Sequence, residues 1–328
     1  MHRTTIWLVV LAVAFFFVGC QKKAPQGQVV IGFVVKTPEE SWFQNEWKFA
    51  QQAADHYAFK LVKIGALDGE KALAAVDNLA AQHADGLIIC TPDPKLGPAI
   101  AAKAKAAGMK LLTVDDQFIG GDNKPMDVHY LGISASDIGK MVGKSLYEQM
   151  QKRGWKNDDT ALCMVTIDQL ETGRQRTEGA AGAMVEAGFP ADRIFRAPWS
   201  TPDASAARDA ANIVLTQHPQ VKHWLVCSTN DVGVTGAIRA MEKRGFDAQN
   251  AIGVGINGGT EAQGEFRSDT PFWGSILLKA RTHGYGTAEM MYLWIKDGKE
   301  PPKLTLTDGI LVTRDNYQEV LKEQGLLD

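Results

Sequence analysis

The chain has 328 residues, of which 45% are hydrophobic and 22% charged, and its formal net charge at pH 7 is −3. This length exceeds what one hydrophobic core usually serves, so two lobes are expected. An acidic balance excludes a typical nucleic-acid binder, which needs a concentrated basic surface to offset phosphate charge.

Residues 1–19 have the pattern of a signal peptide. A basic start, Met1-His2-Arg3, precedes an apolar run from Ile6 to Val18, and this combination is typical of an export signal. The run ends in Phe17-Val18-Gly19-Cys20, which resembles the lipobox of bacterial lipoproteins, although Phe17 stands where Leu is usual. We therefore expect lipidation at Cys20 and a lipid-anchored tether over residues 20–28. A plain cleaved signal and an uncleaved anchor are the alternatives.

From residue 29 onward, short apolar runs alternate with longer amphipathic stretches. The runs predict strands at 29–35, 59–64, 86–90, 110–114, 129–133, 161–166, 223–227 and 251–256. Continuous apolar strands joined by helices indicate parallel sheets covered on both faces. The expected fold class is α/β, with two doubly wound parallel-sheet lobes.

The helices are predicted from their apolar stripes and end signals. Ser41 and Gln44 form an S-x-x-Q capping box, which predicts that the first helix begins near Ser41 and has Trp42 at its first position. The last part of the chain predicts a helix over 281–296, one strand near 304–312 and a short helix over 314–324. The helices between them are expected at 135–152 and from 171 to about 187.

Polar side chains follow the predicted strands in both halves of the chain. They are Lys36, Glu40, Asp115, Asp116, Arg176, Asn230 and Asn257. The carboxyl ends of parallel strands share one edge, and open α/β sheets bind ligands at that edge. Planar groups with several hydrogen-bonding atoms suit a neutral polyhydroxylated ring. An aromatic ring such as Trp42 packs on the C–H faces of such a sugar.

Each of these residues also has a purely structural interpretation. Trp42 can be a core residue, and Arg176 can be a solvated helix residue. Asp115 and Asp116 can be turn residues or helix caps. Asn230 can be a helix N-cap.

The sequence contains none of the common catalytic or nucleotide-binding motifs. It lacks a nucleophile elbow, a zinc-protease motif and a P-loop, and GVGING (253–258) lacks dinucleotide spacing. The spacing of Cys90, Cys163 and Cys227 fits small buried side chains better than a disulfide framework or a zinc site. We therefore expect no enzyme activity, no cofactor and no metal.

Several segments closely resemble L-arabinose-binding periplasmic proteins. They are VVKTPEESWFQNEWKFA (34–50), IICTPDPKLG (88–97), VDDQF (114–118), QKRGW (151–155), QHPQVKHWLV (217–226) and GINGG (255–259). The resemblance covers about residues 29–326. It implies the type I periplasmic binding protein fold, in which a three-crossing hinge joins two lobes. The ranges expected here are 29–133 with 280–309 for the N-terminal lobe and 134–279 with 310–328 for the C-terminal lobe.

The resemblance also implies a role for each candidate residue. The polar set given above corresponds to the family's hydrogen-bonding side chains, and Trp42 corresponds to its stacking ring. The remaining positions that line the family's pocket correspond to Phe43, Cys90, Ile133, Leu170 and Thr172. The sequence departs from the known members of the family at four positions. Ile133 and Thr229 replace Met, Thr260 replaces Asp, and Lys279 replaces Pro. These departures leave the preferred sugar open.

The implied function is capture of a monosaccharide, L-arabinose, D-galactose or D-fucose, for an ABC transporter permease and its ATPase subunits. We expect a periplasmic monomer that touches the membrane only through its lipid anchor. A sugar-sensing subunit for a chemoreceptor or membrane kinase is the main alternative. A glycosidase built on Glu40, Asp115 and Asp116 is less favoured, because Lys and Arg nearby stabilise ionised carboxylates. A repressor would need a DNA-binding N-terminus where the export signal stands.

Overall fold

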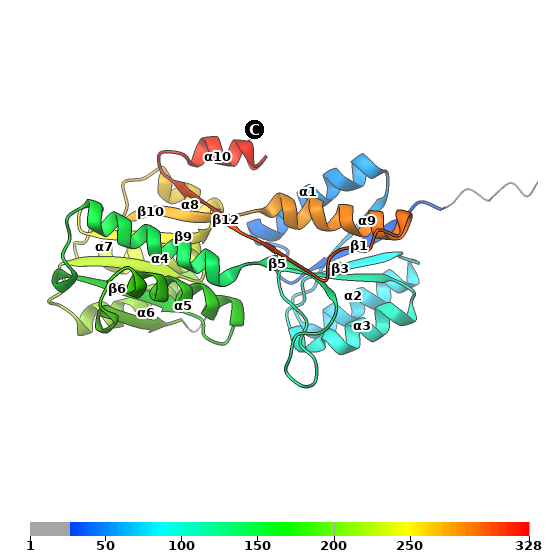
Figure 1. Cartoon of the computed structure of the whole chain (residues 1–328), viewed down its shortest axis with the longest axis horizontal. Coiled ribbons are helices and arrows are strands. Elements are labelled where there is room, and N and C mark those ends of the chain that lie inside the picture. Colours follow the sequence, from blue (N-terminus) through cyan, green and yellow to red (C-terminus); the bar gives the residue numbers. More distant parts are fainter. Residues whose placement is uncertain (1–26, 200, 328) are drawn as a thin grey trace, which may run out of the picture.

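The computed structural model describes residues 27–199 and 201–327, which form two α/β lobes (Figure 1). The predicted signal peptide, the predicted lipidation site Cys20 and most of the predicted tether lie outside the described residues. The N-terminal lobe contains a parallel sheet ordered β2 (Lys60–Gly65), β1 (Val30–Val35), β3 (Gly86–Ile89), β4 (Lys110–Val114), β5 (His129–Ile133) and β11 (Leu304–Thr307).

The C-terminal lobe repeats this arrangement. Its sheet is ordered β7 (Ile194–Pro198), β6 (Thr160–Thr166), β8 (His223–Ser228), β9 (Ala251–Asn257), β10 (Phe272–Leu278) and β12 (Gly309–Thr313). All neighbours are parallel except β10 and β12, which pair antiparallel. The predicted α/β class with two doubly wound lobes is confirmed, and β12 adds one antiparallel edge.

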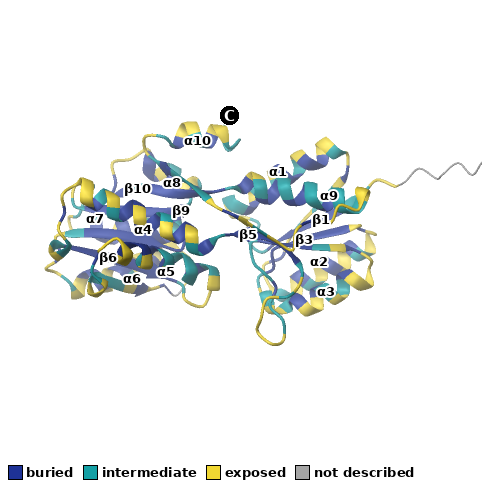
Figure 2. Ribbon diagram, in the orientation of Figure 1, coloured by how far each residue is buried: buried dark blue, intermediate teal, exposed yellow. Residues whose placement is uncertain are grey.

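Helices cover both faces of each sheet because alternate strand side chains point to opposite faces. In β1, Phe33 packs with the core on one face and Val34 with the core on the other. In the N-terminal lobe, α1 (Ser41–Tyr57) and α9 (Thr287–Asp297) cover one face, and α2 (Gly69–Ala81) and α3 (Gly97–Ala106) cover the other. Figure 2 shows the strands buried between helices whose outer sides are exposed.

The C-terminal lobe is covered in the same way. On one face of its sheet lie α4 (Ala135–Lys152) and α5 (Glu171–Glu186). On the other face lie α6 (Ala204–Gln217), α7 (Asp231–Glu242), α8 (Thr260–Phe266) and α10 (Tyr317–Glu323). Among the residues that the structure describes, no helix is long and apolar enough to cross a bilayer.

The chain passes three times between the sheets: from β5 to α4, from β10 toward α9, and from β11 to β12. The prediction of one strand near 304–312 is wrong, because Asp308 separates two strands that belong to different sheets. Lys279 forms an ion pair with Asp308, which ties two crossings together. We propose that the two lobes have the residue ranges predicted from the sequence, 29–133 with 280–309 and 134–279 with 310–328.

The start of α1 also differs from the prediction. Glu40 is its N-cap and makes no side-chain capping bond, and Ser41 is already helical. Gln44 donates to the carbonyl of Pro38 instead of closing a capping box. Trp42 is therefore the second residue of the helix, still at the mouth of the turn that follows β1.

Candidate functional site

The predicted polar residues lie at the carboxyl ends of the central strands. Lys36 follows β1 and Cys90 follows the adjacent β3, while Asp115 and Asp116 follow β4. The connections leaving β1 and β3 cover opposite faces of the sheet, so a crevice forms where these strand ends meet. In the other lobe, Asn230 follows β8, Asn257 ends β9 and Arg176 lies on the helix after β6.

Lys36 and Asp116 form an ion pair at the carboxyl-terminal edge of the N-terminal sheet. Their side chains are 32% and 17% exposed, so the pair is partly accessible. Burial disfavours the ammonium charge, but the nearby acidic groups outweigh it and raise the pKa of Lys36. The Sγ atom of Cys90 lies 3.5 Å from Asp116 Oδ2. The pair therefore offers an ionised donor and an ionised acceptor side by side.

Asp115 is fixed from three directions. Its backbone φ of 64° lies in the left-handed region, which aspartate tolerates. The indole Nε1 of Trp42 donates to Oδ2 at 3.1 Å, and Tyr130 Oη donates to the backbone carbonyl at 2.8 Å. The third contact is His283, whose Nδ1 donates to Oδ1 at 2.8 Å. Trp42 is thus joined to the acidic pair and also packs against the cores of both lobes.

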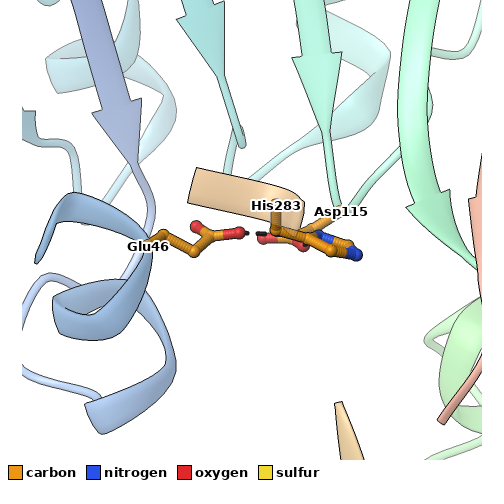
Figure 3. A group of neighbouring side chains, drawn as sticks. All are labelled: Glu46, Asp115 and His283. Atoms are coloured by element: carbon orange, nitrogen blue, oxygen red, sulfur yellow. Dashed lines mark hydrogen bonds and ion pairs between the residues drawn. The ribbon is translucent and has the colours of Figure 1, made fainter. Parts of the chain in front are cut away.

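A buried cluster of Glu46, Asp115 and His283 lies behind this surface (Figure 3). Burial opposes the charge of His283, but the hydrogen bond to Asp115 and the nearby carboxyl group of Glu46 raise its pKa to about 9. Burial and the charge of Asp115 raise the pKa of Glu46 well above its usual range. Burial also opposes ionisation of Asp115, yet His283 holds its pKa below the ordinary value. The cluster therefore favours a charged His283 beside an ionised Asp115 and disfavours ionisation of Glu46.

The donor atoms of this cluster are also those of a metal site. The separation of 2.8 Å between His283 Nδ1 and Asp115 Oδ1 is that of a hydrogen bond, and Glu46 Oε1 lies 3.6 Å from the same nitrogen. The Nε2 atom of His283 is engaged by Thr307 Oγ1 at 2.8 Å. His283 and Asp115 therefore share a proton through a hydrogen bond, whereas neither oxygen of Glu46 has a hydrogen-bond partner among the described residues.

Arg176 faces the opening from the C-terminal lobe. Its Nη1 donates to the carbonyl of Thr229 at 2.6 Å, whereas its buried Nε has no hydrogen-bond partner among the described residues. Burial lowers the pKa of Arg176, and the charges of Asp116 and Asp115 across the opening oppose this shift. A buried donor without a partner is costly, so a rearrangement that brought a ligand oxygen to this atom would be favourable.

Asn230 and Asn257 are the other predicted hydrogen-bonding residues of the C-terminal lobe. Asn230 caps α7 by accepting a hydrogen bond at Oδ1 from Gly233 N at 3.0 Å, which confirms the structural interpretation for that atom. Its amide nitrogen can still donate. Asn257 is half-buried and has a φ of 120°, a conformation that non-glycine residues rarely adopt.

The other predicted residues are less central. Phe43, Cys90 and Ile133 are buried and belong to the cores beside the opening. Thr172 is half-buried, whereas Glu40 and Leu170 are exposed where α1 and α5 begin. Neighbouring residues partly remove water from the carboxyl group of Glu40, which raises its pKa.

A cavity of about 200 Å³ lies between α1 and the Asn257–Gly259 loop. Of the predicted residues, only Trp42 and Asn257 line it. It contains neither the Lys36–Asp116 pair nor Arg176, so we regard it as one margin of the site.

Sequence reasoning missed His283 and Tyr130, which hold Asp115, and Glu46, which lies beside His283. His283 lies in a π-helical turn, Thr282–Gly286, that has no recognisable periodicity. Glu46 is fully buried on α1, although its sequence position looks like that of an ordinary helical glutamate. The one feature of the sequence that points to this contact is the glycine at position 284. In the structure a Cβ at Gly284 would lie 2.2 Å from the carbonyl oxygen of Glu46, so α1 can approach only a glycine there.

Comparisons with known proteins agree with this architecture. Residues 28–320 match the family described as periplasmic binding proteins and sugar binding domain of LacI family. The chain is 46% identical to the L-arabinose-binding periplasmic protein of Escherichia coli and 43% identical to an ABC transporter L-arabinose-binding periplasmic protein of Azospirillum brasilense. Each alignment covers 99% of both chains. These relatives bear the names of binding proteins, not of enzymes.

Solved structures share the fold at low sequence identity. An arabinose-binding protein from Geobacillus stearothermophilus aligns with a TM-score of 0.73 at 15% identity over 89% of this chain and 99% of that one. A solute-binding protein from Actinobacillus succinogenes with bound D-allose aligns with a TM-score of 0.76 at 19% identity, covering 89% and 100%. The chain therefore belongs to the family of periplasmic binding proteins and LacI-type sugar-binding domains.

Proposed function

We propose that this protein captures one neutral monosaccharide between its lobes and delivers it to an ABC transporter. L-arabinose is the first candidate, because two relatives that align over nearly the whole chain are named for it. D-galactose and D-fucose are the further candidates. The observation that carries the proposal is the opposition of Lys36, Asp116 and Trp42 to Arg176, whose buried Nε lacks a partner in the described chain.

The charge states favour binding over glycoside hydrolysis. Hydrolysis needs one carboxylic acid that is protonated in the site and a second carboxylate across the scissile bond. Asp115 has a lowered pKa and Asp116 is paired with Lys36. Both side chains are therefore suited to accept hydrogen bonds from a sugar and not to donate a proton to it. Burial raises the pKa of Glu46, but this side chain is fully buried and exposes no oxygen to a substrate.

Binding is proposed to close the lobes. A sugar would meet the Lys36–Asp116 pair and Trp42 first, and the C-terminal lobe would then bring Arg176, Asn230 and Asn257 to it. The closed arrangement is stabilised by the bonds that it alone makes. Cys20 is proposed to carry the lipid that holds this periplasmic protein at the membrane as a monomer.

Calorimetric titration of the sugar-stripped protein tests the proposal. The panel contains L-arabinose, D-galactose, D-fucose, D-ribose and D-glucose. We expect one-to-one binding of at least one of the first three, and a sugar lacking one bonded hydroxyl should lose about 1–3 kcal/mol. Absence of heat with every pentose and hexose, or release of nitrophenol from nitrophenyl glycosides, contradicts the proposal.

A further inference from the structure

Asp231 is a buried carboxylate beneath the C-terminal side of the site. It is the first residue of α7, directly after Asn230, and is only 1% exposed. Its Oδ1 accepts a hydrogen bond from Ser275 Oγ at 2.6 Å, and its Oδ2 accepts one from the backbone N–H of Gly259 at 3.2 Å. Both carboxylate oxygens therefore have fixed partners.

These bonds fix the loop that follows β9. Ser275 Oγ also accepts a hydrogen bond from the N–H of Gly258 at 3.0 Å. Two successive N–H groups after Asn257 are thus tied, one through the Ser275 hydroxyl and one directly, to the same carboxylate. Strand β9 makes room for it at Gly255, where a Cβ would lie 2.1 Å from Asp231 Oδ1.

The loop needs this support because its backbone is strained. Asn257 has a φ of 120° and Gly258 a φ of 66°. Such a conformation at a non-glycine residue persists only where the surroundings impose it. A Cβ on Gly258 would lie 2.7 Å from Leu277 Cδ1, so the loop also lies directly against β10. The bonds to Asp231 and Ser275 are the polar part of this restraint.

Asp231 also acts on Arg176. Burial of Arg176 disfavours its charge, and Asp231 is one of the acidic groups that oppose the resulting fall in its pKa. Burial raises the pKa of Asp231 itself to about 7, against the hydrogen bond from Ser275. Retaining a buried carboxylate at this cost is typical of functional sites.

We propose that Asp231 is a positioning residue, which acts through Ser275 and the loop after β9 to hold Asn257 in its ligand-binding conformation. This inference rests on the proposed sugar-binding function. A loop held in place before binding loses less conformational freedom when the sugar arrives. Asp231 therefore increases the affinity for every monosaccharide that bonds to Asn257, without touching the sugar.

The test is a double-mutant cycle measured by calorimetry with L-arabinose. Asp231→Asn keeps the size of the side chain but weakens its acceptors, and we expect affinity to fall about tenfold. In a protein that already carries Asn257→Ala, the same change should alter affinity less than about twofold. Equal losses from Asp231→Asn in both backgrounds would overturn the inference, because neither an electrostatic effect on Arg176 nor a general loss of structure depends on Asn257.

Two further variants keep the test decisive. Ser275→Ala removes only the bridging hydroxyl. Its loss of affinity should also be much smaller in the Asn257→Ala background, even if Asp231→Asn fails to fold. Equal losses of affinity from Ser275→Ala in both backgrounds would overturn the inference.

Glu265→Gln is the control, because it changes another buried carboxylate of this lobe, which pairs with Arg239 on α7. It should lower the melting temperature and leave affinity unchanged. If the wild-type protein binds no sugar, the proposed function fails; if it binds and the cycle shows no coupling, only the role of Asp231 fails.

Discussion

His283 joins Asp115 to the hinge. Its Nδ1 donates to Asp115 Oδ1 at 2.8 Å, and its Nε2 lies 2.8 Å from Thr307 Oγ1 in β11. Thr307 is the last residue of β11 before the third crossing between the lobes. A candidate sugar-binding carboxylate and a hinge strand therefore share one buried side chain.

The free energy of unfolding of the sugar-free protein should fall as the pH rises from about 6.5 to about 9. The pKa of His283 is raised from 6.5 to about 9 in the folded state, so the folded protein retains a proton that the unfolded chain releases. The stabilisation is complete below pH 6.5 and is lost as the pH passes through 9, in total about 3 kcal/mol. Urea unfolding at several pH values measures it. His283→Gln should remove this slope, and His129→Gln should retain it; an unchanged slope in His283→Gln contradicts the assignment.

Trp42→Ala should weaken binding of every sugar by about tenfold or more, because an aromatic contact and a bond to a carboxylate are lost together. Trp42→Phe keeps a ring but loses the Nε1 donor to Asp115, so its affinity should be intermediate. Calorimetry gives both values. Trp294→Phe, on α9 where the ring packs against His129, is the matched control and should bind as the wild type does. Unchanged affinity in Trp42→Ala would exclude the stacking role.

Arg176→Lys should reduce affinity about tenfold or more despite the retained charge. An ammonium group cannot bond to the carbonyl of Thr229 and present a second donor from the position of Nε. Arg174→Lys is the control on the same helix, since Arg174 is exposed and pairs with Glu171 and Glu178. Similar affinities for the two variants would argue against a ligand contact by Arg176.

Gly139→Ala should lower both stability and affinity. Helices α4 and α5 approach so closely that a Cβ at Gly139 would lie 2.1 Å from the carbonyl oxygen of Arg176. The helices must separate, which displaces Arg176; overpacking of this kind costs about 1–3 kcal/mol. Gly182→Ala, on α5 where a Cβ meets no described atom within 4 Å, should instead stabilise the helix by up to about 1 kcal/mol. Thermal unfolding and calorimetry compare the pair.

Ile133→Met should change the ratio of affinities for L-arabinose and D-galactose while leaving the fold intact. Ile133 ends β5 beside the first crossing and packs with the core of the C-terminal lobe, and an isoleucine-to-methionine change nearly conserves volume. Leu131→Met on the same strand is the control. Competition titrations with both sugars measure the ratio, and an identical ratio in both variants would show that this position does not set the preference.

Much of the fold was predictable because the central strands are continuous apolar runs. The segments KLLTV and HYLGI match β4 and β5 residue for residue. Strand β7 was missed because it is an edge strand that contains the exposed Arg196 and ends at Pro198, features that weaken a strand pattern. Strand β10 was missed because Gly274 and Ser275 interrupt its apolar run.

The candidate site was predictable where a residue lies at the end of a strand or within two residues after it, as Lys36, Asp116 and Asn257 do. The residues behind them were not. In the sequence Asp231 is one of several polar residues that follow β8. Only the tertiary fold shows that its side chain is buried against Ser275 and the loop after β9. His283 reaches Asp115 over a sequence separation of 168 residues, which no local pattern reveals.

A crystal structure of the protein with L-arabinose would show whether one sugar bridges the two lobes. We expect one sugar molecule that touches both lobes, with Lys36 and Asp116 on one side and Arg176 and Asn257 on the other. Arg176 Nε should then donate to a sugar oxygen, and the Trp42 indole should cover a C–H face of the ring. A sugar bound to one lobe alone, or one seated only in the cavity between α1 and the Asn257–Gly259 loop, would contradict this expectation.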